Sequence, residues 1–286
     1  MKSSKTRKIR WSFFIFFIPV ALWLLLLIVL PHLELLRISL TSSSTKGFTL
    51  ANYAAFFTEP IYWVTFARTA FYSVIVTAIV LLVSLPVSFY ITKVASIKAQ
   101  GLLMVLILVP FWVSELIRVY GWMILLRESG VINAIMLKLG LFNKPIEMLY
   151  NDVTMIMGLV YTSMLFMIVP ITGVMGSLDD SLIEAANDLG AKKITIWKEI
   201  IIPYCMPGIT SGSIIVFMLV LGSYLTPKLM GGKNALWFTE QIYNQIIVYF
   251  NWEQGSAFGF LLLILSSMII WITLKLTKQS FKEVVK

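Results

Sequence analysis

Long apolar runs separated by short charged segments set the pattern of this chain. Each of six runs is about 20 residues or longer, which is the length that spans a bilayer as an α-helix. A backbone inside lipid must satisfy its own hydrogen bonds, so these runs predict an all-α integral membrane protein with a single domain over residues 1–286. The predicted spans are residues 11–30, 69–92, 101–126, 153–176, 207–230 and 257–276.

The first predicted span follows a basic N-terminal segment and ends at Pro31. A basic start before an apolar run is also typical of a secretory signal peptide. However, the run is about 20 residues long and no cleavage site of small residues follows it, so an uncleaved span is favoured. We therefore expect this first run to remain in the protein as a transmembrane helix.

Lysine and arginine residues are concentrated in every second segment between the spans. If the N-terminus is inside the cell, most of the 23 Lys and Arg residues fall on the cytoplasmic side, as the positive-inside rule requires. Both termini and the segment 177–206 are therefore predicted to be cytoplasmic. Nearly all of the net charge of +9 then faces anionic lipid headgroups, so binding to nucleic acid is not needed to explain it.

The composition excludes several kinds of site. The chain is 59% hydrophobic and 13% charged, and it has one cysteine, Cys205, and one histidine, His32. These counts exclude an intrachain disulfide and a metal centre built from several cysteines or histidines. The sequence offers no pairing of a nucleophile with a base, so a membrane enzyme is not indicated. We expect Cys205 to be a small apolar filler and His32 to be an interfacial residue.

The segment 177–206, between the fourth and fifth spans, is too polar to cross a membrane. Ser181 and Glu184 are spaced as a capping box that would start a short helix, and the two aspartates before them favour a helix N-terminus. Gly190 can adopt the left-handed conformation that ends a helix. A second short helix is predicted from an apolar stripe, which two prolines then end at the start of the fifth span: Ile194, Ile196, Trp197 and Ile200, then Pro203 and Pro207.

The spacing of fixed residues in this segment is more specific than its two short helices. Glu184-Ala185-Ala186 is followed after three residues by Gly190, and after nine more by Ile200-Ile201-Ile202-Pro203. This pattern resembles the EAA loop of bacterial ABC importer permeases, with Ile202 in place of a leucine. An ordinary cytoplasmic helical hairpin is the alternative, but it would not require that combination of residues.

The resemblance implies the type I ABC importer permease fold, with six transmembrane helices and a cytoplasmic coupling helix between the fourth and fifth. In that family a separate ATPase dimer binds this helix. The positions carried over to that role are Glu184, Ala185, Ala186, Gly190, Ile200 and Pro203. The chain has no Walker A pattern, so it is not expected to be an enzyme. ATP and Mg²⁺ would be bound by the partner ATPase, and no cofactor is expected in this chain.

Polar residues inside the third span indicate a candidate substrate path, because an ionisable residue facing lipid costs several kcal/mol. Four residues recur at i, i+4, i+7 and i+11, so one helix would place them on one face: Phe111, Glu115, Arg118 and Trp122. Either Glu115 and Arg118 only neutralise each other as an i,i+3 pair, or Glu115 and the aromatic rings line the route of a cation. Pro110 is expected to bend the helix. The candidate path is completed by Trp112, Tyr224 and Glu240, and no metal site is expected.

Three stretches resemble spermidine/putrescine-type permeases among the ABC importers. They are P-F-W-x-x-x-L-I-R-x-Y-G from Pro110, G-S-Y-L-T-P from Gly222 and N-W-E-Q-G-S-A from Asn251. This resemblance implies a polyamine substrate. Lys228 departs from the family pattern, in which an acidic or neutral residue is common. It would repel a polyamine unless it faces lipid headgroups or pairs with Glu240 or Glu253.

As implied by the family, the protein is a permease subunit of the bacterial cytoplasmic membrane. It would form half of a translocation pathway with a second permease, a paralogue, and would work with an ATPase dimer and a soluble substrate-binding protein by alternating access. Two alternatives stay open. One is an importer of another small solute, such as an amino-acid-like ion, iron or an oxyanion. The other is a gradient-driven secondary transporter, which is expected to show inverted halves or broken helices, and neither is evident in the sequence.

Overall fold

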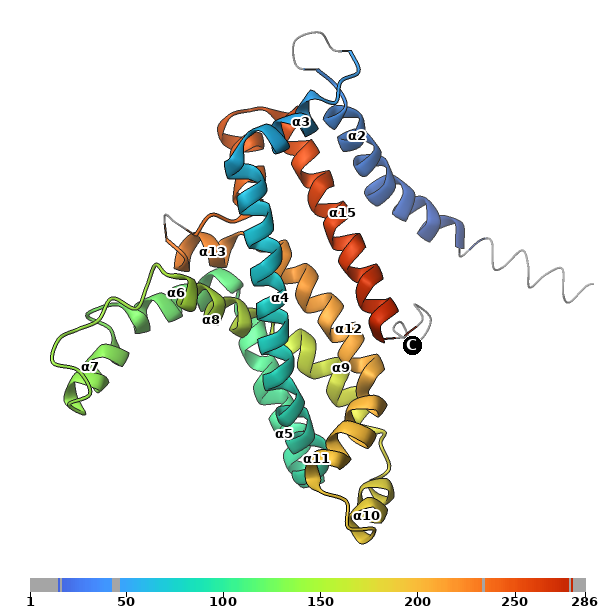
Figure 1. Ribbon diagram of the computed structural model, residues 1–286, viewed down its shortest axis with the longest axis vertical. Coiled ribbons are helices and arrows are strands. Elements are labelled where there is room, and N and C mark those ends of the chain that lie inside the picture. The colour runs from blue at the N-terminus through green and yellow to red at the C-terminus, as the bar shows by residue number, and fades with distance from the viewer. Residues whose placement is uncertain (1–14, 16, 43–46, 233–234, 278, 280–286) are drawn as a thin grey trace, which may run out of the picture. The chain divides into compact units, whose positions relative to one another are not determined.

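The computed structural model describes residues 15, 17–42, 47–232, 235–277 and 279, and the elements in these ranges are helical apart from one isolated bridge between Thr41 and Phe48 (Figure 1). The α-helices are α2 (Leu30–Ser39), α3 (Ala51–Thr58), α4 (Pro60–Phe89), α5 (Ile97–Leu108), α6 (Glu115–Leu126), α7 (Val131–Lys138), α8 (Asp152–Ser163), α9 (Leu165–Gly176), α10 (Asp180–Asp188), α11 (Lys193–Ile196), α12 (Ile202–Leu221), α13 (Leu225–Met230), α14 (Phe238–Tyr243) and α15 (Trp252–Thr277). Short π-helical turns are η1 (Leu25–Val29), η2 (Tyr90–Val94), η4 (Trp197–Ile201) and η5 (Asn244–Val248), and η3 (Val109–Trp112) is a 3₁₀ turn.

The chain forms two compact units, of residues 1–60 with 241–262 and of residues 61–240 with 263–286. In the first unit, the side-chain amide of Asn52 in α3 donates to the backbone oxygens of Ser39 and Thr41, at 2.8 and 3.0 Å. These bonds tie α3 to the end of α2. The predicted site residues all lie in the second unit. The single domain over residues 1–286 remains a prediction.

Within the described residues, four helices are long and apolar enough to cross a membrane: Phe17–Ser39, Pro60–Val94, Lys193–Leu221 and Trp252–Thr277. Two bent pairs pass the same test if each pair counts as one span. They are Ile97–Trp112 with Glu115–Lys138, and Asp152–Ser163 with Leu165–Gly176. The predicted all-α membrane fold is therefore confirmed, although the second span begins at Pro60 rather than at residue 69. Of the first predicted span, residues 11–14 and 16 lie outside the described residues.

The third span, predicted over residues 101–126 with a bend at Pro110, is interrupted by a complete break in this region. The helix α5 passes into η3 and stops at Trp112, and α6 starts at Glu115 on an axis turned by 94°. Pro110 lies in η3, where its ring and missing N–H disrupt a regular α-helix. The fourth span is also bent, by 45° at Met164. Broken helices, which are not evident in the sequence, are therefore present in the structure.

Two helices that were predicted to end at a proline continue through it. The helix α2 contains Pro31, and the helix Lys193–Leu221 contains both Pro203 and Pro207. A π-turn, η1 or η4, comes just before the first proline of each helix. The wider turn accommodates a ring that lacks an N–H donor. The second short helix predicted in the coupling segment is thus the start of the fifth span, which ends at Leu221 rather than at residue 230.

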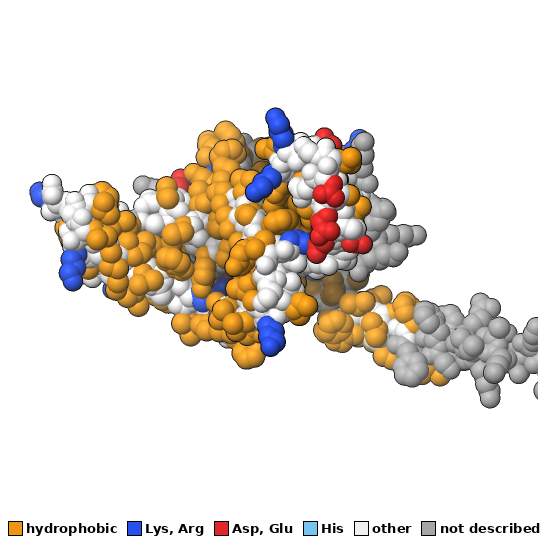
Figure 2. Space-filling model, turned by 90° about the horizontal axis from the view of Figure 1, so that it is seen from below, with side chains coloured by type: hydrophobic (Ala, Val, Ile, Leu, Met, Phe, Trp, Pro, Cys, Tyr) orange, Lys and Arg blue, Asp and Glu red, His pale blue; other side chains and the backbone are white. Residues whose placement is uncertain are grey.

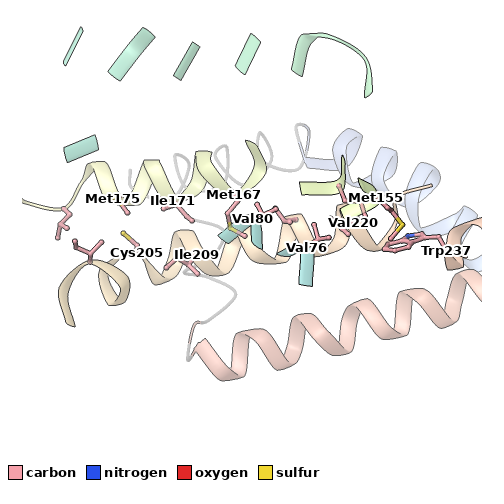
Figure 3. Packing of buried hydrophobic residues seen from close by; sticks show 14 of the residues in the cluster. Val76, Val80, Met155, Met167, Ile171, Met175, Cys205, Ile209, Val220 and Trp237 are labelled. Atoms are coloured by element: carbon pink, nitrogen blue, oxygen red, sulfur yellow. The ribbon is translucent and has the colours of Figure 1, made fainter. Parts of the chain in front are cut away.

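The core of the second unit lies where α9 and α12 pack along their lengths (Figure 3). The buried side chains at this interface are Met167, Ile171 and Met175 of α9, with Cys205 and Ile209 of α12. A Cβ atom at Gly208 would lie 2.7 Å from the backbone oxygen of Pro170, so the close approach requires a glycine. Small residues are the usual means by which membrane helices pack closely. Cys205 has 0% exposure, which confirms its predicted role as a filler.

Candidate functional site

A cavity of about 590 Å³ lies in the second unit, where three helices are interrupted. The interruptions are residues 113–114 between η3 and α6, Met164 between α8 and α9, and residues 222–224 between α12 and α13. Inside a membrane, irregular backbone is tolerated where it lines a cavity. The lining residues are Phe111, Glu115, Arg118, Leu159, Thr162, Ser163, Phe166, Leu219, Val220, Gly222, Ser223, Tyr224 and Leu225.

The structure brings some of the predicted path residues together and separates others. The four that line the cavity are Phe111, Glu115, Arg118 and Tyr224. Trp112 does not line it and is 91% exposed, and Trp122 instead packs edge-on against Tyr161 with ring centres 5.6 Å apart. The single helical face that was expected to join these residues does not exist, because the break falls between Phe111 and Glu115. The bend nevertheless places both at the same cavity.

Glu115 presents a carboxylate to the cavity from the first residue of α6. Ser114 caps this helix, since its Oγ accepts from the N–H of Ile117 at 3.4 Å. A carboxylate at a helix N-terminus is favoured by the helix dipole. One of its oxygens accepts a hydrogen bond from the Thr226 hydroxyl at 2.9 Å. In the described part of the chain Glu115 forms no ion pair, so mutual neutralisation with Arg118 is wrong.

The Arg118 guanidinium lies between two aromatic rings. Its central carbon is 4.4 Å from the ring centre of Phe111 and 5.8 Å from that of Tyr161. Its Nε and Nη1 atoms are buried and have no hydrogen-bond partner among the described residues. Cation–π attraction offsets part of the cost of desolvation. Two free donors beside a cavity still indicate a place where an acceptor can bind.

Glu240, the remaining predicted path residue, lies at a second cavity of about 460 Å³. There it forms an ion pair with Lys228, which confirms one of the two pairings predicted for that lysine. Tyr150 and Gly232 line the same cavity, and both have left-handed backbone, with φ of 62° and 74°. The carboxylate of Glu240 therefore offsets the positive charge that would otherwise repel a polyamine.

A polar cluster that the sequence analysis missed joins α4 to the start of α8. Asp152 accepts hydrogen bonds from Nη2 of Arg68 and from the hydroxyl of Tyr72, each at 2.5 Å. Tyr72 stacks on the buried ring of Trp237, with ring centres 6.5 Å apart. Arg68 was missed because the second span was placed to begin just after it, whereas α4 begins at Pro60. An isolated arginine beside a long apolar run is the sequence feature that could have indicated Arg68.

A short helix, α10, forms in the predicted coupling segment, but its start differs from the prediction. Asp179 caps the helix, because its Oδ1 accepts from the N–H of Ser181 at 3.0 Å. The predicted capping box of Ser181 and Glu184 is therefore wrong. The hydrogen bond from the Ser181 backbone lowers the pKa of Asp179, since it favours the charged carboxylate. At the other end Gly190 has φ of 75°, which is the left-handed conformation that was predicted.

The residues predicted to receive the ATPase differ in exposure. Glu184, Ala185, Gly190 and Pro203 are exposed, whereas Ala186 and Ile200 are half-buried and pack on the core. A Cβ atom at Gly190 would meet no described atom within 4 Å, so its surroundings are open. Figure 2 views this end of the molecule from below and shows acidic and basic side chains on a largely hydrophobic surface. The helix α10 thus combines exposed charge with small side chains.

No protein-family model matches the chain. Comparisons with individual proteins and with solved structures both find permeases of ABC transporters. The chain is similar to the spermidine/putrescine transport system permease protein PotB of Haemophilus influenzae, with 32% identity over 267 residues, 92% of this chain and 93% of that protein. PotB of Escherichia coli K12 is also 32% identical, over 92% of this chain and 96% of that protein. The fold is similar to that of one chain in a crystal structure of a bacterial alginate ABC transporter in complex with an alginate pentasaccharide-bound periplasmic protein. The match covers 98% of this chain and 100% of that chain, with a TM-score of 0.80 at 16% identity. The structural match confirms the ABC importer permease fold.

Proposed function

Because this chain belongs to the family of spermidine/putrescine transport system permeases, we propose that it forms half of the pathway by which an ATP-driven importer carries a polyamine across the bacterial inner membrane. As a permease subunit it is a transport protein and not an enzyme. In the proposed assembly a paralogous permease forms the other half of the pathway. An ATPase dimer binds ATP and Mg²⁺, and a soluble binding protein delivers the substrate. Both termini and α10 would face the cytoplasm, as the charge distribution predicts.

The observation that carries the polyamine proposal is the carboxylate of Glu115 in the cavity, where no described cation pairs with it. A polyamine is a chain of ammonium groups joined by methylenes. The carboxylate offsets one ammonium, the ring of Tyr224 attracts cations, and the ring of Phe111, which already contacts Arg118, accommodates methylenes. An inside-negative potential favours entry by about 2.3 kcal/mol per charge per 100 mV. One carboxylate, rather than a cluster, suits a site that must release its substrate.

Replacing Glu115 tests this role. We expect Glu115→Gln to lower uptake at limiting spermidine by about tenfold, because a hydrogen bond to a charged group contributes about 1.5–3 kcal/mol. Uptake of labelled spermidine is measured in proteoliposomes that hold the complete transporter, with its binding protein outside and ATP inside. The matched control is Glu128→Gln, since Glu128 is exposed and does not line the cavity. Equal uptake by Glu115→Gln and the parent would show that Glu115 does not meet the substrate.

Arg118 favours a second candidate, an importer of a small solute that carries a hydrogen-bond acceptor as well as a cation. Its two unpartnered donors would bind a carboxylate, which a polyamine lacks and an amino-acid-like ion has. Competition separates the two candidates in the same proteoliposomes. Inhibition of spermidine uptake by putrescine, without inhibition by basic amino acids, supports the polyamine. Uptake of a basic amino acid that exceeds uptake of spermidine supports the second candidate.

We propose that ATP hydrolysis is coupled through α10, with Glu184, Ala185, Ala186 and Gly190 as the contact with the ATPase. The small side chains of the two alanines allow another protein to approach closely, and the open surroundings of Gly190 leave room for it. Purification of the chain with its natural neighbours tests the coupling. An ATPase that remains bound supports it, whereas spermidine flux through this chain alone, driven by a proton gradient, contradicts it.

A further inference from the structure

Lys93 joins the start of α10 to the end of the helix that α4 begins. It lies in η2, the π-turn that continues α4, and its side chain is 7% exposed. Its ammonium donates to the backbone oxygen of Leu178 at 2.5 Å and to Oδ1 of Asp180 at 2.6 Å. Leu178 comes just before α10, and Asp180 is the first residue of that helix. One nearly buried cation therefore holds the turn from which α10 starts.

The two bonds of Lys93 differ in their surroundings. The Asp180 side chain is 67% exposed, so water and salt screen this ion pair. Leu178 is only 3% exposed, so water screens its carbonyl bond less than it screens the ion pair. If the nearly buried ammonium lost this acceptor, it would keep only the exposed ion pair with Asp180. The hydrogen bond to the Leu178 carbonyl is therefore expected to be the stronger of the two bonds.

The chain on both sides of this turn is attached to the core helices. In α9, the Thr172 hydroxyl donates to Oγ of Ser88 in α4 at 3.0 Å. In α12, the Tyr204 hydroxyl donates to the backbone oxygen of Ser177 at 3.0 Å. The turn before α10 is thus bonded directly to η2 and α12, and α9 is bonded to α4. Because α9 and α12 also contribute residues to the cavity, these bonds connect α10 to its walls.

We propose that Lys93 is a positioning residue that makes the start of α10 move together with α4. Force from the ATPase would then shift the span instead of bending the turn at Leu178. This inference rests on the proposed function, in which α10 is the contact with the ATPase. Apolar packing of Leu178 cannot replace the two bonds, because the hydrophobic effect is not directional. Without Lys93, the ATPase still docks and hydrolyses ATP, but a smaller part of its movement reaches the helices around the cavity.

The test measures the number of ATP molecules hydrolysed per spermidine imported, in proteoliposomes that hold the complete transporter. We expect Lys93→Met to raise this ratio about fivefold, in the range by which substitutions along a coupling route act. Lys93→Arg, which can donate to both acceptors, should restore most of the coupling. Asp180→Asn should raise the ratio less than Lys93→Met does, because the Leu178 carbonyl keeps its donor. The matched control is Lys98→Met, since Lys98 is exposed and its side chain forms no bond to the described residues.

Several outcomes would overturn the proposal. A parental ratio in Lys93→Met would show that Lys93 does not transmit movement, and loss of ATPase binding in that variant would show that it shapes the docking surface instead. If Lys93→Met does not assemble, Asp180→Asn decides, and a parental ratio in that variant also overturns the proposal. Failure of the proposed function has a different signature, since the parent transporter itself would then show no ATP-dependent spermidine uptake.

Discussion

The cavity around Glu115 and the turn that starts α10 are both rich in charged groups, but they satisfy those groups in opposite ways. In the cavity, Arg118 keeps two buried donors without a described partner. At the turn, Lys93 has two close acceptors and Asp179 caps the helix. Donors without a partner in the protein suit a site that binds and releases a ligand. Charged groups that are fully hydrogen-bonded suit a segment that must move as a rigid body, as the start of α10 would. The two regions are therefore suited to different tasks.

The largest expected effect comes from disturbing the exposed end of α10. Gly190→Arg should lower spermidine uptake at least tenfold, on the order of the coupling free energies known for distant sites, while leaving membrane insertion intact. The residue has φ of 75°, which strains a side chain other than glycine, and a bulky cation would occupy the open space beside it. Uptake is measured in proteoliposomes, and insertion by the amount of protein recovered from membranes.

Gly140→Arg is the matched control for this prediction. Gly140 has φ of 71° and equally open surroundings, but it lies beyond α7, outside the coupling segment. We expect nearly parental uptake from this variant. Parental uptake from Gly190→Arg would contradict the role of α10, and equal losses in both variants would attribute the effect to backbone strain alone.

A smaller effect, on substrate binding, is expected from a substitution in the cavity. Whether binding becomes tighter or weaker depends on the substrate. Arg118→Gln removes a positive charge, so direct binding of spermidine to the permease should tighten about threefold through reduced repulsion in a partly screened environment. Binding is measured by equilibrium dialysis with no binding protein present. Arg127→Gln is the control, because Arg127 is exposed and outside the cavity. Weaker binding of spermidine by Arg118→Gln would instead favour the solute that carries an acceptor.

The smallest effect concerns the pH dependence of the cap on α10. The pKa of Asp179 is lowered in the folded helix, so its stabilisation is fully present above the ordinary value and is lost as pH falls through the lowered value. Protection of the Ser181 amide against hydrogen exchange, corrected for the intrinsic rate, should fall modestly over that acidic range. Asp179→Asn keeps an effective cap that does not titrate, so its protection should not change with pH. Equal pH dependence in both proteins would assign the effect to another group.

The sequence predicted the end of α10 better than its start, and the reason is local. A left-handed residue at a helix end is usually glycine, so the end of α10 could be placed at Gly190 from one residue type. The start offered three candidate caps in succession, Asp179, Asp180 and Ser181, and the structure uses the first. Asp180 is instead bonded by Lys93 from a position 87 residues away. Contacts at that separation cannot be inferred from spacing alone.

Four residues that line the cavity were predicted from the sequence, but the way in which the helices form the cavity was not. Glu115 and Arg118 were found because charges inside an apolar run are costly and therefore informative. Pro110 predicted a bend in this region, but the sequence did not indicate the complete break between Trp112 and Glu115, because the chain is apolar on both sides. The chain bends by 94° there, and on one side of the break Phe111 packs edge-on against Phe166 of α9 with ring centres 5.8 Å apart. A helical period describes one helix and cannot show where two helices meet.

The burial of Cys205 has a practical consequence for following these movements. It is the single thiol of the chain and has 0% exposure, between α9 and α12. A maleimide dye or nitroxide reagent added to the folded transporter should therefore react with a cysteine newly introduced on α10 and spare the native one. Spectroscopic reporters can then be placed on the helix without first removing a residue from the core.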